Sequence, residues 1–162
     1  MKKITIVIIG LFVLLAFAGT AIAKNPTETN KATGGGTFLL RDFKDTIGFT
    51  AIQIDDQYDA KGQITIQYRN NEGPEGPGHN LVKVDVTTLV VEGNKAWIAG
   101  VITKSFDPSF VGDGLLLEVI DDSPDKLAFG GGDVTPEEAR NLALEKFEFE
   151  SPASISGSIK VS

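Results

Sequence analysis

The sequence predicts an all-β, mainly antiparallel fold: a small closed or partly open β-barrel of about eight strands with one late α-helix. Three observations predict it. Short runs that alternate apolar and polar side chains recur along the chain, turns rich in glycine, proline and aspartate separate them, and only one segment has helical spacing. A two-sheet β-sandwich fits the same strand count and stays open as the alternative.

The N-terminal 23 residues have the three parts of a secretory signal peptide. Two lysines precede an apolar run at residues 4–17, and Ala21 and Ala23 form a small-residue cleavage site. The run is shorter than the roughly 18 residues that a membrane-spanning helix needs. No cysteine is present to carry a lipid. We therefore expect an exported protein, periplasmic or extracellular, that starts at Lys24 and has no stable membrane anchor.

The rest of the chain has the size of one domain. Residues 24–33 are polar and predict a flexible leader, and residues 34–162 predict a single barrel-like domain. Because the chain has no cysteine, neither a disulfide nor a thiolate-bound metal can stabilise it. Without its two N-terminal lysines it has 13 basic and 22 acidic residues, a net charge of −9. Such a charge repels phosphate, so nucleic acid is not an expected partner.

The first strands are predicted from alternating runs. Residues 37–40 follow three glycines and form the first strand. A second run starting at Thr46 changes phase after Ala51, which predicts a β-bulge or a sharp bend. A turn then leads into a half-buried strand at residues 64–69. Residues 70–80 are rich in glycine and proline and have no apolar side chain, so we expect an exposed loop.

The second half of the chain continues as a meander. Valines alternate with polar residues from Val82, and the phase shifts again before Leu89. The turn at residues 92–95 predicts a hairpin into the next strand. Further strands are expected at residues 96–103, 115–120 and 126–129, and at 155–161, where the last could close the sheet against the first.

One helix interrupts the strands, from about Pro136 to Lys146. Thr135 supplies an N-cap hydroxyl, Pro136 occupies the first helical position, and Glu138 completes a capping box. Apolar residues at helical spacing follow, so the helix should bury one face.

Three glycines, residues 130–132, precede this helix and invite the hypothesis of a phosphate-binding loop. Asp133, Glu137 and Glu138 already occupy the positive end of the helix dipole, however, and no Lys-Ser or Lys-Thr pair follows the glycines. We therefore interpret these glycines as a flexible connection.

Tyr68, Trp97 and His79 are the candidate ligand-binding residues. Trp97 lies on a predicted strand and could line a carbohydrate-binding face with Tyr58 and Tyr68, although core or rim packing explains the same position. His79 is the only histidine and lies in the loop at residues 70–80. It could act as a general base or be a solvated loop residue. The chain has no G-x-S-x-G motif that would supply a nucleophile.

Aspartates gather at two strand ends, where their carboxylates could converge on a calcium ion. The candidate calcium ligands are Asp121, Asp122 and Asp125, and a second cluster holds Asp55, Asp56 and Asp59. Neither cluster has the spacing of an EF-hand loop, and aspartate commonly forms turns. Apart from calcium, no cofactor is expected.

A carboxylate pair for glycoside hydrolysis could also be drawn from Glu118, Asp121 and Asp122. That chemistry requires two carboxyl groups roughly 5 to 9 Å apart. The sequence does not give this separation.

Several short motifs occur in order: GGG at 34–36, GF at 48–49, KG at 61–62, VVEGNKAWIAG at 90–100 and EVIDDSP at 118–124. This set resembles a group of small secreted prokaryotic β-barrel proteins and modules of uncharacterised function, which tend to have V-x-D-N-G-x-P at the last motif. Ser123 departs from that pattern, the loop at 70–80 is unusually rich in glycine and proline, and the helix looks inserted before the last strand. The resemblance implies fold and export and assigns no catalytic residue.

The sequence thus predicts an exported, non-enzymatic binding or interaction module for a small ligand, a glycan or a protein, since no nucleophile, metal or cofactor constellation is recognisable. Two alternatives stay open. A carboxylate-dependent hydrolase or lyase would bring His79 together with Glu118 or Asp121 in one pocket. A structural component of an exported assembly would carry a broad apolar patch or an unpaired sheet edge.

Overall fold

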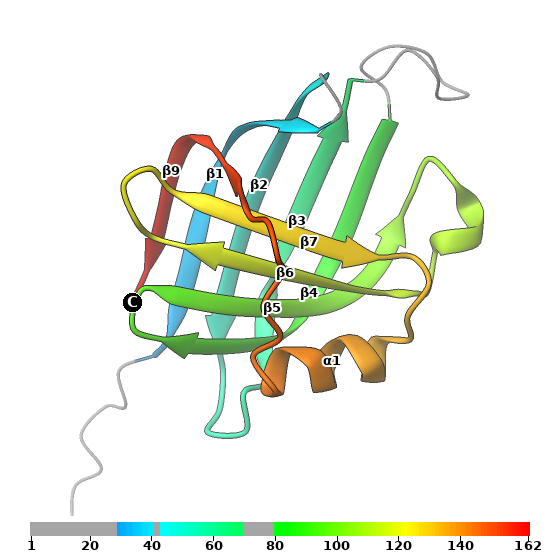
Figure 1. Cartoon of the computed structure of the whole chain (residues 1–162). Coiled ribbons are helices and arrows are strands. Elements are labelled where there is room, and N and C mark those ends of the chain that lie inside the picture. Colours follow the sequence, from blue (N-terminus) through cyan, green and yellow to red (C-terminus); the bar gives the residue numbers. More distant parts are fainter. Residues whose placement is uncertain (1–28, 41–42, 70–79) are drawn as a thin grey trace, which may run out of the picture.

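The computed structural model describes residues 29–40, 43–69 and 80–162, and it is an antiparallel β-barrel with one α-helix on its outer surface (Figure 1). The elements, in chain order, are β1 (Lys31–Leu40), β2 (Phe43–Gln53), β3 (Ala60–Tyr68), β4 (Asn80–Glu92), β5 (Lys95–Lys104), the short 3-10 helix η1 (Pro108–Phe110), β6 (Gly114–Ile120), β7 (Lys126–Gly131), α1 (Pro136–Leu144), β8 (Ala153–Ser154) and β9 (Ser156–Val161).

The last two strands close the sheet on itself. The strand order is β8-β7-β6-β5-β4-β3-β2-β1-β9, and every neighbouring pair is antiparallel. Only Ile155 separates β8, which pairs with β7, from β9, which pairs with β1. One kinked strand therefore joins both edges of the sheet, which makes the barrel nearly closed. The predicted barrel is confirmed, and its sandwich alternative is not the fold.

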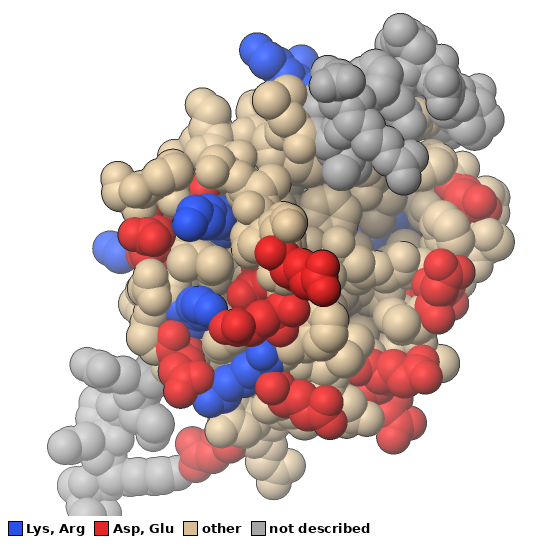
Figure 2. All heavy atoms as spheres, in the orientation of Figure 1, with Lys and Arg blue, Asp and Glu red and all other residues tan. Residues whose placement is uncertain are grey.

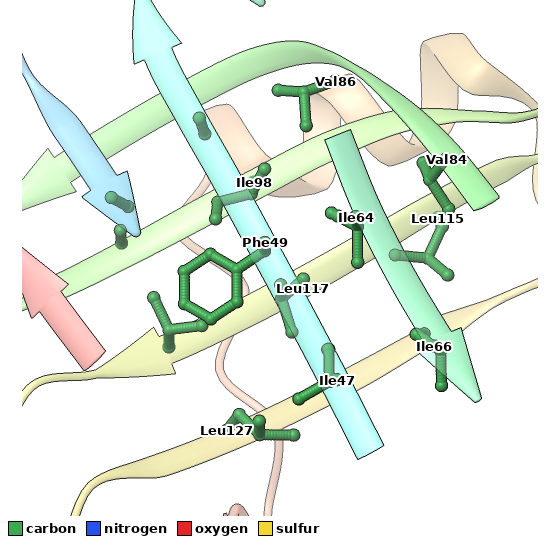
Figure 3. Close-up of a cluster of buried hydrophobic side chains, with 14 of the residues drawn as sticks. Ile47, Phe49, Ile64, Ile66, Val84, Val86, Ile98, Leu115, Leu117 and Leu127 are labelled. Carbon is green, nitrogen blue, oxygen red and sulfur yellow. The ribbon is translucent and has the colours of Figure 1, made fainter. Parts of the chain in front are cut away.

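Alternating side chains fill the barrel interior. Figure 3 shows apolar side chains from opposite walls pointing toward one another, among them Phe49 on β2, Ile64 on β3 and Leu117 on β6. All three are buried. Burying an aliphatic or aromatic side chain of this size stabilises the fold by about 1.5 to 3 kcal/mol, and the packed interior leaves the ends and the outer wall of the barrel for binding.

The two predicted phase shifts have different outcomes. The second is a real irregularity, because the pairing of β4 with β5 shifts register between Val86 and Thr88. The first is not a β-bulge, because β2 pairs regularly with β3 as far as Gln53 and Ala60. The strand ends at Gln53, and the apolar side chain of Ile54 is 58% exposed in the following turn instead of continuing a strand.

The first strand begins earlier than predicted. Lys31–Thr33, assigned above to the leader, belong to β1, where Ala32 is fully buried between Ala51 of β2 and Val161 of β9. The glycines that looked like a boundary lie inside this strand. A Cβ on Gly36 would lie 2.8 Å from the Cα of Gly157, so the absence of side chains lets the closing strand approach β1.

The predicted helix is present and its capping box is complete. The Glu138 backbone N–H donates to Thr135 Oγ1 (3.2 Å), and the Thr135 N–H donates to Glu138 Oε2 (2.7 Å). These bonds from Thr135 lower the pKa of Glu138. The helix ends at Leu144, two residues before the predicted end, and Lys146 has a positive φ of 56° that turns the chain away.

Helix α1 packs on the outside of β4, β5 and β6 (Figure 1). Its buried residues are small, Ala139 and Ala143, and they lie in a second apolar cluster with Val90, Trp97 and Leu116. Among the described residues, no helix has the length and hydropathy that a membrane span requires.

After α1 the chain crosses the outside of β5, β6 and β7 before it reaches β8 (Figure 1). We call residues 145–152 the crossing segment. Acidic side chains, with basic ones among them, are spread over this face of the molecule (Figure 2).

Candidate ligand-binding site

A pocket of about 230 Å³ lies at the end of the barrel where β3, β5 and β7 terminate, and we call it the mouth pocket. Its wall is mainly aromatic and aliphatic. The lining side chains are Tyr68, Val82, Ile102, Ser105, Phe106, Phe110, Leu115 and Phe129, and the backbone of Gly130–Gly132 completes it. The filled interior lies directly below, so a ligand here would occupy the mouth and not the lumen.

The loop after β5 supplies two of these rings. Phe106 precedes η1, and Phe110 is its last residue. The N-cap of η1 is Asp107, whose carboxylate accepts the N–H of Ser109 (2.9 Å) and its hydroxyl (2.7 Å). These bonds lower the pKa of the Asp107 carboxyl. The cap and the proline at position 108 fix the short helix, which holds both phenylalanines toward the pocket.

Edge-to-face contacts hold the rings in place. Tyr68 and Phe106 have centroids 5.7 Å apart at an interplanar angle of 76°. Phe129 makes a similar contact with Phe38 of β1, at 5.7 Å and 83°. Such geometry is favourable beyond the area buried, so the pocket is built before any ligand arrives.

The glycines before α1 form part of the pocket wall. Gly130 and Gly131 belong to β7, and Gly132 has a φ of +90°. A Cβ on Gly132 would lie 3.1 Å from the ring of Phe110, so glycine allows this ring to pack against the backbone. The predicted flexible connection is therefore partly strand.

A buried carboxylate lies beside Tyr68. Asp45 of β2 is 2% exposed, and its Oδ1 accepts the backbone N–H of Arg69 at 2.8 Å. Burial, and secondarily the negative charge of Asp45, raises the pKa of Tyr68 to about 12. A tyrosine phenol is neutral at physiological pH with or without this shift, and a neutral phenol has one O–H that can donate a hydrogen bond to a ligand.

Of the other two predicted ligand-binding residues, Trp97 does not join Tyr68. Trp97 lies on the outer face of β5, beneath α1 and the crossing segment, and is 2% exposed. Its Nε1 donates to the backbone oxygen of Phe147 at 2.9 Å. His79 lies outside the described residues. Of the three, the structure places Tyr68 in a pocket.

The predicted calcium ligands make hydrogen bonds that close the barrel. Asp121 Oδ2 accepts the N–H of Val161 (3.1 Å), and Asp125 Oδ2 accepts the N–H of Ile159 (2.8 Å), both on β9. Asp125 Oδ1 also accepts the N–H of Asp122 at 3.0 Å. Among the described residues, no group of three or more acidic or histidine side chains is arranged to hold a metal ion.

The second aspartate cluster organises the turn between β2 and β3. Asp55 Oδ1 accepts the N–H groups of Gln57 (2.9 Å) and Asp59 (3.1 Å). Asp59 itself pairs with Arg140 of α1 at 2.7 Å. These contacts are those of a turn that docks against the helix.

Glu118, the candidate carboxylate for hydrolysis, is buried on the outer face of β6. Its Oε2 accepts the N–H of Phe149 in the crossing segment at 3.0 Å. Neither Glu118 nor Asp121 lines the mouth pocket. The structure therefore does not bring these two carboxylates together in the mouth pocket.

Sequence reasoning missed Phe106, Phe110 and Asp45 as site residues. The segment Phe106-Asp107-Pro108-Ser109-Phe110 contained a usable pattern, an N-cap aspartate followed by proline between two aromatic residues. For Asp45 the sequence offers no comparable sign, because an aspartate next to a strand is usually a turn residue.

In comparisons with protein-family models, curated proteins and solved structures, nothing matches this chain. The resemblance to small secreted prokaryotic β-barrel proteins stays a prediction.

Proposed function

We propose that this chain is an exported, non-enzymatic binding module that holds a ring-sized group of its partner in the mouth pocket. The observation that carries the proposal is the aromatic pocket above a filled barrel interior. Its volume of about 230 Å³ lies below the roughly 300 to 1,000 Å³ of pockets that enclose a whole drug-sized molecule. A ring that projects from a small ligand, a glycan or a protein fits this size.

The chemistry of the wall supports a partner that is both apolar and polar. Phe106, Phe110 and Phe129 offer ring faces or edges for stacking, and the neutral phenol of Tyr68 offers one hydrogen bond. Sugar rings and aromatic groups combine these features. We also propose that the protein is exported, on the basis of the predicted signal peptide. Mass spectrometry of the protein from the cell envelope or medium should then find an N-terminus at Lys24.

The two alternatives have less support. Glu118 and Asp121 accept backbone N–H groups of the fold, which favours a structural role for both over acid–base catalysis. In the described part of the chain, β9 pairs with β1 from Ala32 to Thr37 and β8 pairs with Lys126 and Leu127 of β7, so most of the β1 edge is covered and only short edges stay open to an assembly partner.

A thermal-shift screen tests the binding proposal. Residues 24–162 contain every strand of the barrel, and a ligand that binds only the folded state raises its melting temperature. The probes are indole, phenol, mono- and disaccharides, and calcium with and without EDTA. Ser105→Phe should fill the mouth pocket and abolish any shift caused by a ring-containing probe.

Thr103→Phe is the matched control, since Thr103 is exposed near the end of β5, two residues before Ser105, and does not line the pocket. It should keep the shift. A probe that stabilises the wild type and Ser105→Phe equally would place binding elsewhere and contradict the proposal.

A further inference from the structure

The kinked strand formed by β8 and β9 leaves a gap in the pairing of the barrel wall. The pairing of β1 with β9 ends at Thr37 and Ser156, while β8 pairs with β7 on the other side of Ile155. Phe38 and Leu39 of β1 therefore have no partner in β9. Two hollows of about 660 Å³ and about 320 Å³ lie beside the kink between β8 and β9, and both are lined by Phe38, Leu39 and Ala153. We call the two together the seam groove.

The larger hollow contains two cations. Lys44 of β2 pairs in register with Leu39, and continuing the β2–β3 register from Thr46 and Gln67 places Arg69 beside Lys44. Like charges at neighbouring positions of a sheet repel each other. Neither Lys44 nor Arg69 forms an ion pair with another described residue. The ion pairs between described residues are Lys95–Glu148, Arg140–Asp59 and Lys146–Glu92.

The rest of this hollow suits an anion. Among the described residues, the remaining polar side chains that line it are three hydroxyl groups, on Thr37, Ser154 and Ser156, and none of its described lining residues is a carboxylate. That composition is notable in a chain with 22 acidic and 15 basic residues. A bound anion would remove the repulsion between Lys44 and Arg69.

An apolar path leads away from the cations. Leu39, the neighbour of Lys44, is 63% exposed. Beyond it, the smaller hollow is lined by Leu127, Phe129 and Phe149 with one carboxylate, Glu150. A large exposed leucine between two cations and an apolar hollow fits a ligand with a charged head and a hydrocarbon tail.

From this juxtaposition we infer that the seam groove binds a single-chain amphiphilic anion, a medium- or long-chain carboxylate. Its carboxylate lies between Lys44 and Arg69, and its chain runs over Leu39 into the smaller hollow. This site shares the Phe129 ring with the mouth pocket, but its other lining residues are different, and the inference does not depend on the function proposed for the mouth pocket.

The test is calorimetric titration of residues 24–162 with dodecanoate below its critical micelle concentration. Dodecanol, which lacks the charge, and acetate, which lacks the chain, are the comparison ligands. Dodecanoate should bind at least tenfold more tightly than either. Affinity should rise about three- to fourfold for each methylene added from octanoate to dodecanoate.

The variant Lys44→Gln/Arg69→Gln should weaken dodecanoate binding at least tenfold. The control Lys61→Gln/Lys160→Gln removes the same charge from two exposed strand positions outside the groove and should change the affinity less than twofold. Equal loss in both variants, equal binding of dodecanol, or no binding of dodecanoate would overturn the inference.

The variant Ser105→Phe separates this inference from the proposed function. It should leave dodecanoate binding unchanged, because Ser105 lines the mouth pocket and neither hollow of the seam groove. If it alone abolishes binding, the carboxylate occupies the mouth pocket and the seam inference fails. Binding to phosphatidylglycerol vesicles through Lys44 and Arg69, with none to free dodecanoate, would assign the groove to a membrane surface and overturn it too.

Discussion

Trp97 and Glu118 face each other across β5 and β6, and together they hold the backbone of the crossing segment. The indole Nε1 donates to the oxygen of Phe147 at 2.9 Å, and Glu118 Oε2 accepts the N–H of Phe149 at 3.0 Å. Buried polar groups need such partners, because an unpaired one costs free energy of desolvation. This pair therefore attaches the chain after α1 to the barrel wall and directs it toward the closing strand.

Substitution of Trp97 tests this attachment. Trp97→Ala should lower the free energy of unfolding by about 3 to 5 kcal/mol, since it removes a buried ring. Trp97→Phe keeps most of the ring volume and loses the hydrogen bond, so about 1 to 2 kcal/mol is expected. Urea unfolding followed by circular dichroism measures both, and an unchanged midpoint for Trp97→Ala would show that the side chain is not buried.

Arg140 fixes α1 to the turn between β2 and β3. Its guanidinium bonds to Asp59 (2.7 Å), Thr88 Oγ1 (3.0 Å) and the oxygen of Gln57 (3.1 Å). Thr88 is fully buried, so Arg140→Ala leaves its hydroxyl without this donor and should cost about 1 to 2 kcal/mol.

The control for Arg140 is Lys146, whose ion pair with Glu92 is exposed. Lys146→Ala should cost less than about 0.5 kcal/mol. Equal effects of the two substitutions in urea unfolding would show that the Arg140 contacts add nothing beyond a surface ion pair.

The aspartates after β6 should behave as parts of the barrel closure. Asp125→Ala removes the acceptor for two N–H groups, those of Ile159 and Asp122, and should destabilise the fold by about 2 kcal/mol. Asp122→Ala is the control, because its side chain is exposed and should cost less than about 0.5 kcal/mol.

Calcium titration of the same variants addresses the metal prediction. If Asp121, Asp122 and Asp125 form a calcium site, calcium raises the melting temperature of the wild type, EDTA reverses the rise, and Asp122→Ala abolishes it. If the three aspartates have a purely structural role, calcium raises the melting temperature of no variant, and Asp125→Ala is destabilised both with calcium and with EDTA.

Local patterns were enough to predict the architecture. The alternation of apolar side chains gave the strands, and the capping box at Thr135 and Glu138 gave the start of α1. Both depend on neighbouring residues alone. The glycines at 34–36 led to a wrong prediction of where β1 begins. They are required because β9, more than a hundred residues later in the chain, packs closely against β1 at these positions.

The candidate sites depend on contacts that no local pattern contains. The sequence predicts Tyr68 as a ligand-binding residue because it is an aromatic residue on a strand, but the rings that surround it come from β7 and from the segment after β5. Lys44 and Arg69 are ordinary surface residues in the sequence. Only the register of β2 with β3 brings them together, and only the kink at Ile155 opens the groove beside them.

The titration of Tyr68 gives a test of the mouth itself. Its pKa of about 12 has burial as the main cause and the charge of Asp45 as the second. Absorbance at 295 nm should therefore show a tyrosine that ionises near pH 12. Tyr68→Phe should remove this step, Tyr58→Phe should leave it in place, and Asp45→Asn should move it to lower pH.

The same shift makes the stability of the barrel depend on pH. An unfolded tyrosine ionises near pH 10, whereas folded Tyr68 stays neutral to about pH 12. Between these values the unfolded state binds fewer protons, so the free energy of unfolding contributed by Tyr68 falls by about 1.4 kcal/mol per pH unit as pH rises, and it is fully present below pH 10. Unfolding by urea at pH 9, 10 and 11 measures the slope, and the difference between wild type and Tyr68→Phe isolates this contribution from other groups. Parallel slopes in the two proteins would mean that the phenol is solvated, and the mouth pocket would then lack the buried, neutral hydroxyl proposed to meet a ligand.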